Sequence, residues 1–499
     1  WGQLTSMRTA LILLFLLALA AIPGSVVPQS AQSAMKVSDF AANHPTLDRI
    51  CRPLGMYHVY TSVWFSAIYL LLLISLIGCI VPRIVSHAKA LRRQPPRVPA
   101  RLDRLAAHAS MTTSASAAEV SQRAQQWLTS HRYRFVVDDD GSLRAEAGRH
   151  RETGNLVFHI FLVFVLVGVG WNTLWGFKGT SVVVEGQGFS NSITQYDEFK
   201  AGAMVDIDNL TPFSMKLRKF VVSFETGTVQ RGAARSFDAT VDLTMGGKTQ
   251  TRDLQVNHPL RIGSTKVHLL GHGYAADVVV RDGDGKVAYS GPVVFLPQDA
   301  NFKSVGVIKV PDARPDRLAF QGFFLPTGAI TAGGPTSLFP DALNPQLYLT
   351  AWYGKPTVET GVPSNIYTLD TTGLTQVTNG KDKARFVLSP GQRYKLPDGK
   401  GSIQFNGWQR WAKIQVSQNP GLPLTFLSVV LSVAGLCVSL FSRSRRVWVR
   451  TIPGDDGLRV EIGGLDRSDS RSGAVDDVNS LLAALHGDSM SGDVGEEHS

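Results

Sequence analysis

A histidine inside an apolar stretch is the residue of this sequence best placed to do chemistry. Residues 154–176 read GNLVFHIFLVFVLVGVGWNTLWG, and His159 is their only ionisable side chain. A run of this length and composition crosses a bilayer as a helix, and a histidine that loses its hydration there faces a partner, a cavity or a bound metal. Two interpretations stay open from the residues alone. His159 hydrogen-bonds a neighbouring helix, or its neutral imidazole binds the iron of haem or another metal.

The other candidate ligands are histidines in less restrictive settings. His58 begins the second apolar block, where a hydrated role at the membrane surface is favoured over ligation. His258, His268 and His272 lie in NHPLRIGSTKVHLLGHGYA, and their spacing around two glycines could gather metal ligands. Histidines on loops and strand surfaces are the commoner case. We therefore predict no metal site at these four histidines, and His159 is left as the candidate metal ligand.

Two further patterns carry no chemistry of their own. The run DGDG at residues 282–285 superficially resembles a calcium loop, but the remaining ligand positions are missing, so we predict a hairpin tip. Cys51, Cys79 and Cys437 lie far apart and form no C-x-x-C motif. The chain is therefore neither a disulfide scaffold nor a thiol oxidoreductase by itself. No nucleophile and base are recognisable together in the large polar segment, so no catalytic residue is predicted.

Four apolar blocks predict four transmembrane helices that frame these residues. They cover residues 1–26, 58–82, 154–176 and 420–442. The first block also resembles a signal peptide, with a basic start and a small-residue end. No clear A-x-A cleavage site follows it and further spans come after it, so we predict a retained helix.

The basic residues predict the orientation of these helices. The net charge of +10 gathers beside the apolar blocks, in residues 83–104, 149–151 and 443–450, and positive charge marks the cytoplasmic side of a membrane. Aromatic residues such as Trp64 and Trp171 mark the opposite ends. Both termini are then cytoplasmic, and residues 27–57 and 177–419 are extracytoplasmic. Anionic lipid explains the charge better than nucleic acid, for which no binding motif is present.

Three segments complete the predicted architecture. Residues 83–153 form a small cytoplasmic module, with a helix over 117–130 and a hairpin of strands 133–137 and 142–147. Residues 177–419 contain short runs of β-branched and aromatic residues separated by glycine-rich turns, which predicts an all-β, sandwich-like domain. Residues 443–499 are a cytoplasmic tail, largely disordered at its end. The fold class is a membrane protein with four transmembrane α-helices, a large extracytoplasmic all-β domain and a small cytoplasmic α+β module.

The sequence resembles the ResB/CcsB family of System II cytochrome c biogenesis proteins over roughly residues 1–450. The resemblance is carried by WGQLTSMRTALILLFLLALAAIPGSVVPQ at the start, by GNLVFHIFLVFVLVGVG, and by NHPLRIGSTKVHLLGHGYA in the large segment. It implies a bacterial plasma-membrane protein that carries haem to the outer face, where haem is joined through thioether bonds to C-x-x-C-H of apocytochrome c. The family has a haem-binding histidine in its third span, and His159 matches that position.

The resemblance also implies partners. A CcsA/ResC-type membrane protein completes the cytochrome c synthase, and its tryptophan-rich haem-handling segment is absent here, because the paired tryptophans of this chain lack the acidic pattern. The chain is thus expected to be a non-catalytic or partial subunit of a haem lyase, acting with apocytochrome c and with thiol-reducing proteins of the ResA/CcdA type. The alternative is a non-catalytic membrane anchor whose β domain binds an exported protein or partner.

Overall fold

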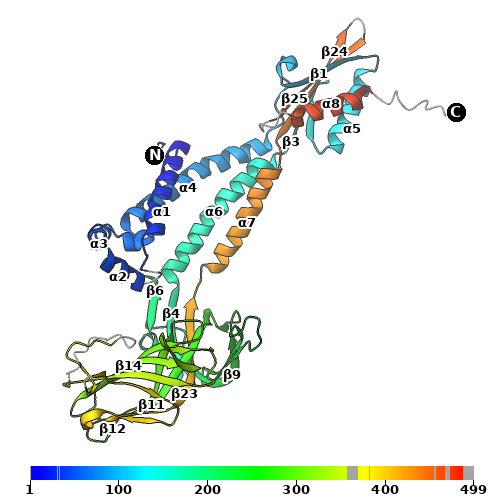
Figure 1. Cartoon of the computed structure of the whole chain (residues 1–499). Helices are drawn as coiled ribbons and strands as arrows, with labels where there is room; N and C mark the ends of the chain where they lie inside the picture. Colours follow the sequence, from blue (N-terminus) through cyan, green and yellow to red (C-terminus); the bar gives the residue numbers. More distant parts are fainter. Residues whose placement is uncertain are drawn as a thin grey trace, which may run out of the picture. The chain divides into compact units, whose positions relative to one another are not determined.

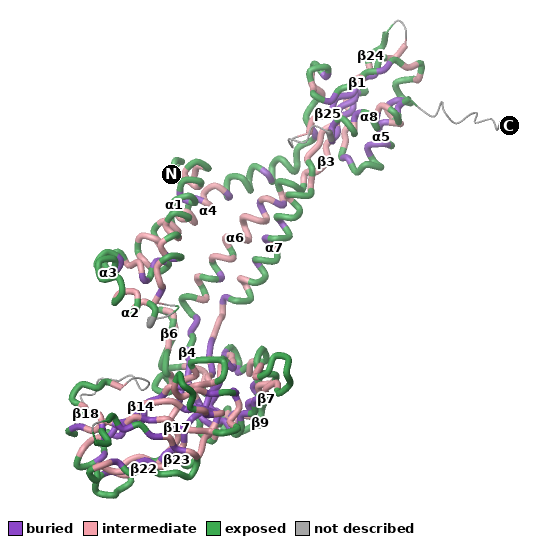
Figure 2. Tube along the Cα trace, viewed as in Figure 1, coloured by how far each residue is buried: buried purple, intermediate pink, exposed green. Residues whose placement is uncertain are grey.

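The computed structural model describes residues 2–30, 32, 34–356, 369–380, 382–454, 457–466 and 472–486 (Figure 1). The chain divides into two compact units. One comprises Trp1–Val169 together with Leu422–Ser499, and the other is Gly170–Gly421. Buried residues concentrate in the sheet-forming parts, whereas the long apolar helices are mostly exposed or half-buried (Figure 2). Exposed apolar surface on a helix is what a lipid environment covers.

The described residues contain four helices long and apolar enough to cross a membrane: α1 (Met7–Val26), α4 (Val63–Arg92), α6 (His150–Trp175) and α7 (Leu422–Phe441). They confirm the four helices predicted from the apolar blocks. The helix α4 continues ten residues beyond the predicted end at 82, across Pro82. A proline within an apolar helix is tolerated where neighbouring groups satisfy the freed backbone.

Helix α1 packs against α4 through polar contacts with the chain that precedes it. The Ser75 hydroxyl donates to the Leu4 carbonyl at 2.7 Å, and the Cys79 thiol donates to the Thr5 carbonyl at 2.7 Å. The segment that connects α1 to α4 along the chain contains α2 (Ala34–Asn43), α3 (Pro45–Cys51) and the short 3₁₀ helix η1 (Met56–Thr61). The Tyr57 hydroxyl donates to Asp48 at 2.8 Å and ties this connection together.

Helices α6 and α7 approach each other closely at a pair of glycines. A Cβ atom added to Gly154 would lie 2.6 Å from the Gly435 carbonyl oxygen, and one added to Gly435 would lie 2.7 Å from the Phe158 nitrogen. The Ser432 hydroxyl donates to the Phe158 carbonyl at 3.3 Å. Small residues are what allow two helix backbones to approach this closely in a membrane. The crossing therefore holds the first turns of α6 in place, and His159 follows them on the same helix.

A small α+β module is built from two distant parts of the chain. Its elements are η2 (Leu102–Arg104), β1 (Ala107–Thr113), α5 (Ala117–Ser130), β2 (Arg134–Val137), β3 (Leu143–Ala147), β24 (Arg445–Gly454), β25 (Gly457–Asp466) and α8 (Ser472–His486). The strands form one sheet in the order β1-β25-β24-β3-β2. The predicted helix over 117–130 is confirmed, and so is the β2–β3 hairpin. A capping box between Ser116 and Glu119 starts α5, which explains why its beginning was visible in the sequence.

The prediction of a largely disordered end for the tail is wrong for residues 472–486, which form the helix α8. Strands β24 and β25 lie in the middle of the sheet, and α8 packs against it through Ala474, Val478, Leu481 and Leu485. The Asp477 carboxylate accepts hydrogen bonds from Tyr133 at 2.7 Å and from Arg445 at 2.8 and 2.9 Å. The charged and glycine-rich composition suggested disorder because the partner surface is supplied by residues far away in sequence. Residues 487–499 lie outside the described part.

The large segment, predicted to be all-β and sandwich-like, is mostly β in its described residues, which confirms the predicted β content. Its main sheet has twelve strands, with the path β18-β17-β14-β13-β12-β11-β23-β4-β6 and with β10, β21 and β22 attached at its sides; β5-β7-β8-β9 form a second sheet, and two small hairpins complete it. The strands are β4 (Phe177–Val184), β5 (Gly188–Ser190), β6 (Glu198–Ala201), β7 (Ser214–Phe224), β8 (Ala234–Met245), β9 (Lys248–Gln255), β10 (Leu260–Ile262), β11 (Thr265–Arg281), β12 (Val287–Pro297), β13 (Ser304–Val310), β14 (Arg317–Leu325), β15 (Gly328–Thr331), β16 (Gly334–Ser337), β17 (Gln346–Gly354), β18 (Thr375–Gln376), β19 (Thr378–Asn379), β20 (Asp382–Lys383), β21 (Arg385–Leu388), β22 (Arg393–Lys395) and β23 (Ser402–Gln418).

Two long strands organise this β region. Strands β11 and β23 pair antiparallel from Thr265 with Gln418 to Arg281 with Ser402. One apolar core lies toward the β13–β17 side and another between β23, β4 and the four-stranded sheet. Residues 282–285 form the turn between β11 and β12, where the Asp282 amide donates to the Lys286 carbonyl at 2.9 Å. The predicted hairpin tip is therefore confirmed.

Each helix of the α6/α7 pair is preceded and followed along the chain by a β-strand. Helix α6 runs into β4, which pairs with β23, the strand that precedes α7. At the other ends, β3 precedes α6 and pairs with β24, which follows α7. Gly148 lies so close to the Arg443 backbone that a Cβ atom there would be 1.7 Å from the Arg443 carbonyl oxygen. The two helices are thus joined by backbone hydrogen bonds on both sides.

Candidate functional site

The composition of helix α6 changes from polar to apolar along its length, and this change sets the depth of His159 in the predicted span. Its first turn is polar, from His150 to Thr153, and Gly154 then packs against α7. After Asn155 the sequence is apolar apart from His159 until the last turns. His159 therefore lies about one turn inside the apolar part, on a helix whose start is held by the glycine crossing.

The ring of His159 has one nitrogen bonded and the other free. Its Nδ1 atom lies 2.8 Å from the Asn155 carbonyl oxygen, one turn earlier in the same helix. A carbonyl oxygen only accepts hydrogen bonds, so Nδ1 carries the proton of the neutral ring and Nε2 carries the lone pair. The ring is half-buried and meets Phe158 edge-on with 4.9 Å between centroids. No hydrogen bond to Nε2 is present among the described residues.

This arrangement suits a metal ligand. Histidines that bind metals usually donate the other ring N–H to a carboxylate or a backbone carbonyl, which fixes the tautomer and the ring orientation. The Asn155 carbonyl plays that part here. The simple structural interpretation, a hydrogen bond to another helix, finds no partner in the described part of the chain. The geometry therefore leaves Nε2 available to an iron atom.

A second histidine near this helix was missed by the sequence analysis. His87 lies on α4 with 8% of its side chain exposed, and its Nε2 atom is 2.9 Å from the Thr153 hydroxyl of α6. Its Nδ1 atom is 3.5 Å from a Glu152 carboxylate oxygen, and Arg83 approaches the other oxygen at 3.8 Å. The basic run from residue 83 was interpreted only as a sign of topology. The i, i+4 spacing of Arg83 and His87 would have placed both on one helix face.

The other histidines singled out from the sequence do not gather. His58 is exposed in η1, and His258 is exposed beside β9. A β-bulge between Leu269 and Gly271 turns His268 and His272 to opposite faces of β11. Among the described residues, no group of three His, Cys, Asp and Glu side chains is gathered as a metal site requires.

His272 instead lies in an aromatic cluster of the β region. Its ring stacks on Phe302 with 4.7 Å between centroids, and Phe220, Phe224 and Phe237 surround it. Burial, with the positive charge of Arg410 second, lowers the pKa of His272 to about 4. The ring is therefore neutral at ordinary pH. This cluster joins the four-stranded sheet to β11 and gives His272 a packing role.

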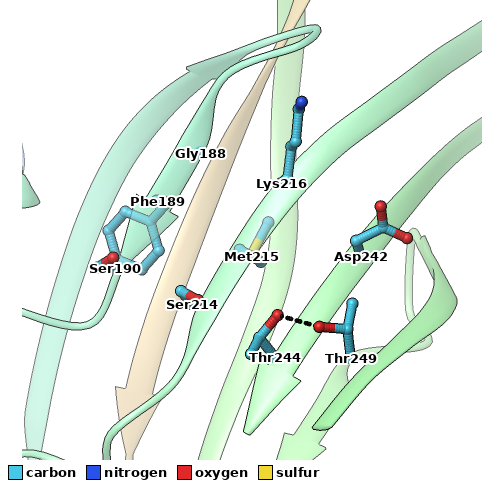
Figure 3. Close-up of a pocket in the computed structure, with 9 residues that line it drawn as sticks. All are labelled: Gly188, Phe189, Ser190, Ser214, Met215, Lys216, Asp242, Thr244 and Thr249. Carbon is cyan, nitrogen blue, oxygen red and sulfur yellow. Dashed lines mark hydrogen bonds between the residues drawn. The ribbon is translucent and has the colours of Figure 1, made fainter. Parts of the chain in front are cut away.

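A surface pocket of about 480 Å³ lies on the four-stranded sheet (Figure 3). Polar side chains of β7, β8 and β9 line much of it, including Lys216, Asp242 and the hydrogen-bonded pair Thr244 and Thr249. Asp242 is already engaged by Arg218 and Thr251. The pocket contains no arrangement of acid, base or nucleophile, so we assign no chemistry to it.

Four long apolar helices, a histidine with one free nitrogen in the third of them, and a large mostly-β segment define an integral membrane protein with a candidate ligand inside a span. The sequence profile of the ResB-like family matches residues 7–475. The chain belongs to the ResB-like family, which confirms the resemblance noted from its sequence.

Similar proteins cover most of the chain. Cytochrome c biogenesis protein CcsB of Synechococcus sp. (strain JA-3-3Ab) is 24% identical over 456 residues, which are 89% of this chain and 82% of that protein. The protein of the same name from Nostoc sp. (strain PCC 7120) is 24% identical over 472 residues, 92% of this chain and 87% of its own length. The one from Microcystis aeruginosa is 22% identical over 480 residues, 93% and 91% of the two chains.

Proposed function

We propose that this chain is a cytochrome c biogenesis subunit that carries haem across the plasma membrane, with His159 as an axial ligand of the iron. The observation that carries the proposal is the free Nε2 atom of His159 within an apolar helix, with Nδ1 fixed by the Asn155 carbonyl. The names of its relatives support the same process, because they are cytochrome c biogenesis proteins. Haem is here the cargo of the protein.

The residues of this chain hold and orient the cargo. His159 supplies one iron ligand, and its bond to Asn155 keeps the lone pair pointing away from the helix backbone. The glycine crossing with α7 fixes the turn before it. His87 contacts Thr153 and Glu152 in the first turn of α6, about 10 Å along the helix from His159, so we do not assign it to the iron. The second axial ligand therefore comes from a partner subunit.

The proposed orientation follows the basic residues. Arginines and lysines flank α4, α6 and α7 on the side of the α+β module, and the aromatic residues Trp171 and Trp175 lie at the other end of α6. We place the module and both ends of the chain in the cytoplasm and the β region outside. His159 then lies close to the cytoplasmic leaflet, where haem made inside the cell would reach it.

The proposed partners complete the reaction. A CcsA/ResC-type membrane protein would receive haem and join it to apocytochrome c, whose cysteines are kept reduced by ResA/CcdA-type proteins. The part of this chain would be to hold haem and to present it. The β region is the part that would face apocytochrome c outside the membrane.

A His159→Ala variant of the full-length protein, purified together with its partner, tests the proposal. We expect normal insertion and assembly, little bound haem by absorbance, and little covalent cytochrome c on haem-stained gels. Added imidazole should restore part of both signals, because it fills the vacated ligand position. His258→Ala, which changes an exposed histidine of the β region, is the control and should behave as wild type. Full haem content and full maturation in His159→Ala would leave the membrane-anchor function as the better description.

A further inference from the structure

We propose that Arg83 and His87 of α4 bind the carboxylate groups of the haem whose iron is held by His159. The inference rests on the function proposed above and adds the residues that recognise the charged edge of the cargo. It gives the haem one orientation, with its carboxylates at the ends of α4 and α6 that adjoin the α+β module.

Arg83 and His87 already face a carboxylate, but loosely. The two Glu152 oxygens lie 3.8 Å from Arg83 Nε and 3.5 Å from His87 Nδ1. Hydrogen bonds of this kind are usually about 2.7–3.2 Å long. His87 Nδ1 is a buried atom without a hydrogen-bond partner, and such an atom is costly to leave unpaired. A carboxylate placed closer would therefore be favoured over the present contact.

One tautomer of His87 suits a carboxylate ligand. Its Nε2 atom is 2.9 Å from the Thr153 hydroxyl. When that hydroxyl donates to Nε2, the proton of the neutral ring is on Nδ1 and points at the Glu152 side. The ring then offers an N–H donor, and Arg83, four residues earlier on the same helix face, offers a charged one.

The spacing along α6 matches the size of haem. Glu152 precedes His159 by seven residues, so both lie on one face of the helix, about 10 Å apart at 1.5 Å per residue. Haem is a rigid disc with iron at its centre and two carboxylates on one edge. The distance from the iron to the end of a carboxylate side chain is comparable to this spacing. One haem can thus reach His159 and the Arg83–His87 pair together.

The polarity along the helices gives the same orientation. Polar and charged residues surround the start of α6, including Arg149, whereas residues 156–170 are apolar apart from His159. Carboxylates are far more costly to bury among apolar residues than at such an end. The apolar face of the disc and the apolar turns of α6 then meet. Glu152 acts as a placeholder that a haem carboxylate displaces.

Titration of the haem-free, full-length protein with haem and with haem dimethyl ester tests the inference. The ester keeps the iron but has lost both carboxylate charges. Absorbance measures binding of each, and the ratio of the two dissociation constants is the readout. We expect wild type to prefer haem by about fivefold, as partly exposed charge pairs allow. Arg83→Gln and His87→Gln should bring the ratio close to one, and Arg83→Lys should retain most of it.

Two controls separate recognition from structure. Arg151→Gln removes the same charge from an exposed position on another face of α6 and should keep the wild-type ratio. Glu152→Gln removes the placeholder and should bind haem at least as tightly as wild type. If Arg83 and His87 only hold α4 against α6, Glu152→Gln should weaken haem binding as much as Arg83→Gln and His87→Gln do. That result would show that the inference is wrong. It is also wrong if Arg83→Gln and His87→Gln keep the wild-type ratio.

Failure of the inference is distinguishable from failure of the proposed function. His159→Ala should weaken binding of haem and of its ester alike, because both present iron. If it does so while the ratio stays unchanged in Arg83→Gln, His159 binds iron but the carboxylates lie elsewhere. If His159→Ala binds both compounds as wild type does, the haem-ligand role itself is refuted.

Discussion

Replacing His272 with phenylalanine should remove a specific acid sensitivity of the β region. His272 has 8% of its surface exposed, and its pKa of about 4 lies below its ordinary value of 6.5 because of burial and of the charge on Arg410. Above pH 6.5 the ring is neutral in the folded and the unfolded chain and contributes no pH dependence. Between pH 6.5 and about 4 the unfolded chain takes up a proton that the folded chain excludes, so stability falls as the pH falls.

The size of the effect follows from the same two values. Each pKa unit corresponds to about 1.4 kcal/mol, so the histidine costs the folded state about 3 kcal/mol by pH 4. Phenylalanine keeps an aromatic ring to stack on Phe302 and removes both the titration and the unpartnered Nδ1 atom. The His272→Phe variant should therefore match wild type near pH 7 and exceed it progressively toward pH 4.

Hydrogen–deuterium exchange of β11 and β23 in the full-length protein, measured from pH 7 to pH 4.5 and corrected for intrinsic rates, follows this difference. An exposed histidine of the same region, changed as His258→Gln, should leave the wild-type profile. Parallel profiles for wild type and His272→Phe would refute the reasoning, because the buried ring would then not resist protonation in the folded state.

The remaining predictions address the other parts of the chain. Asp477→Asn weakens the carboxylate bonds that hold α8, so protection of α8 against exchange should fall by about 2 kcal/mol; Asp476→Asn, at an exposed neighbour, should not change it. Gly154→Ala forces α6 and α7 apart and should cost about 1–3 kcal/mol in thermal unfolding in detergent. Its control is Gly170→Ala, where an added Cβ meets no atom within 4 Å. In a chain otherwise free of cysteine, Asp284→Cys should react with an impermeant thiol reagent in intact cells; reaction only after permeabilisation would overturn the proposed orientation.

Local patterns in the sequence predicted the elements that depend on local interactions. The four apolar runs indicated their helices because burial in lipid needs only composition and length. Helix α5 was predicted from helical spacing, and Ser116 with Glu119 caps it. Strands β24 and β25 were not predicted, because they pair with β3 and β1, which lie far earlier in the sequence. The buried face of α8 likewise has meaning only when that sheet is present.

The candidate site was predicted where a single residue stands out against its surroundings. His159 is unusual in an apolar run, and its position alone drew attention to it. The bond between Nδ1 and the Asn155 carbonyl depends on the ring's rotamer, which the sequence does not specify. His87 was overlooked because the second apolar block was predicted to end at residue 82, whereas the helix continues to Arg92. The separation of His268 from His272 depends on a bulge that strand alternation does not predict.

The strand pairings that flank α6 and α7 on both sides oppose sliding of one helix along the other. Eight residue pairs join β4 to β23, and five join β3 to β24. Sliding one helix along the other by about 3.3 Å, the rise of one residue in a strand, would shift both strand pairings by one residue and exchange the faces of their side chains. A piston motion is thus opposed at two places at once. Bending or tilting of the two helices together breaks neither pairing, so these are the motions that the strand pairings leave free.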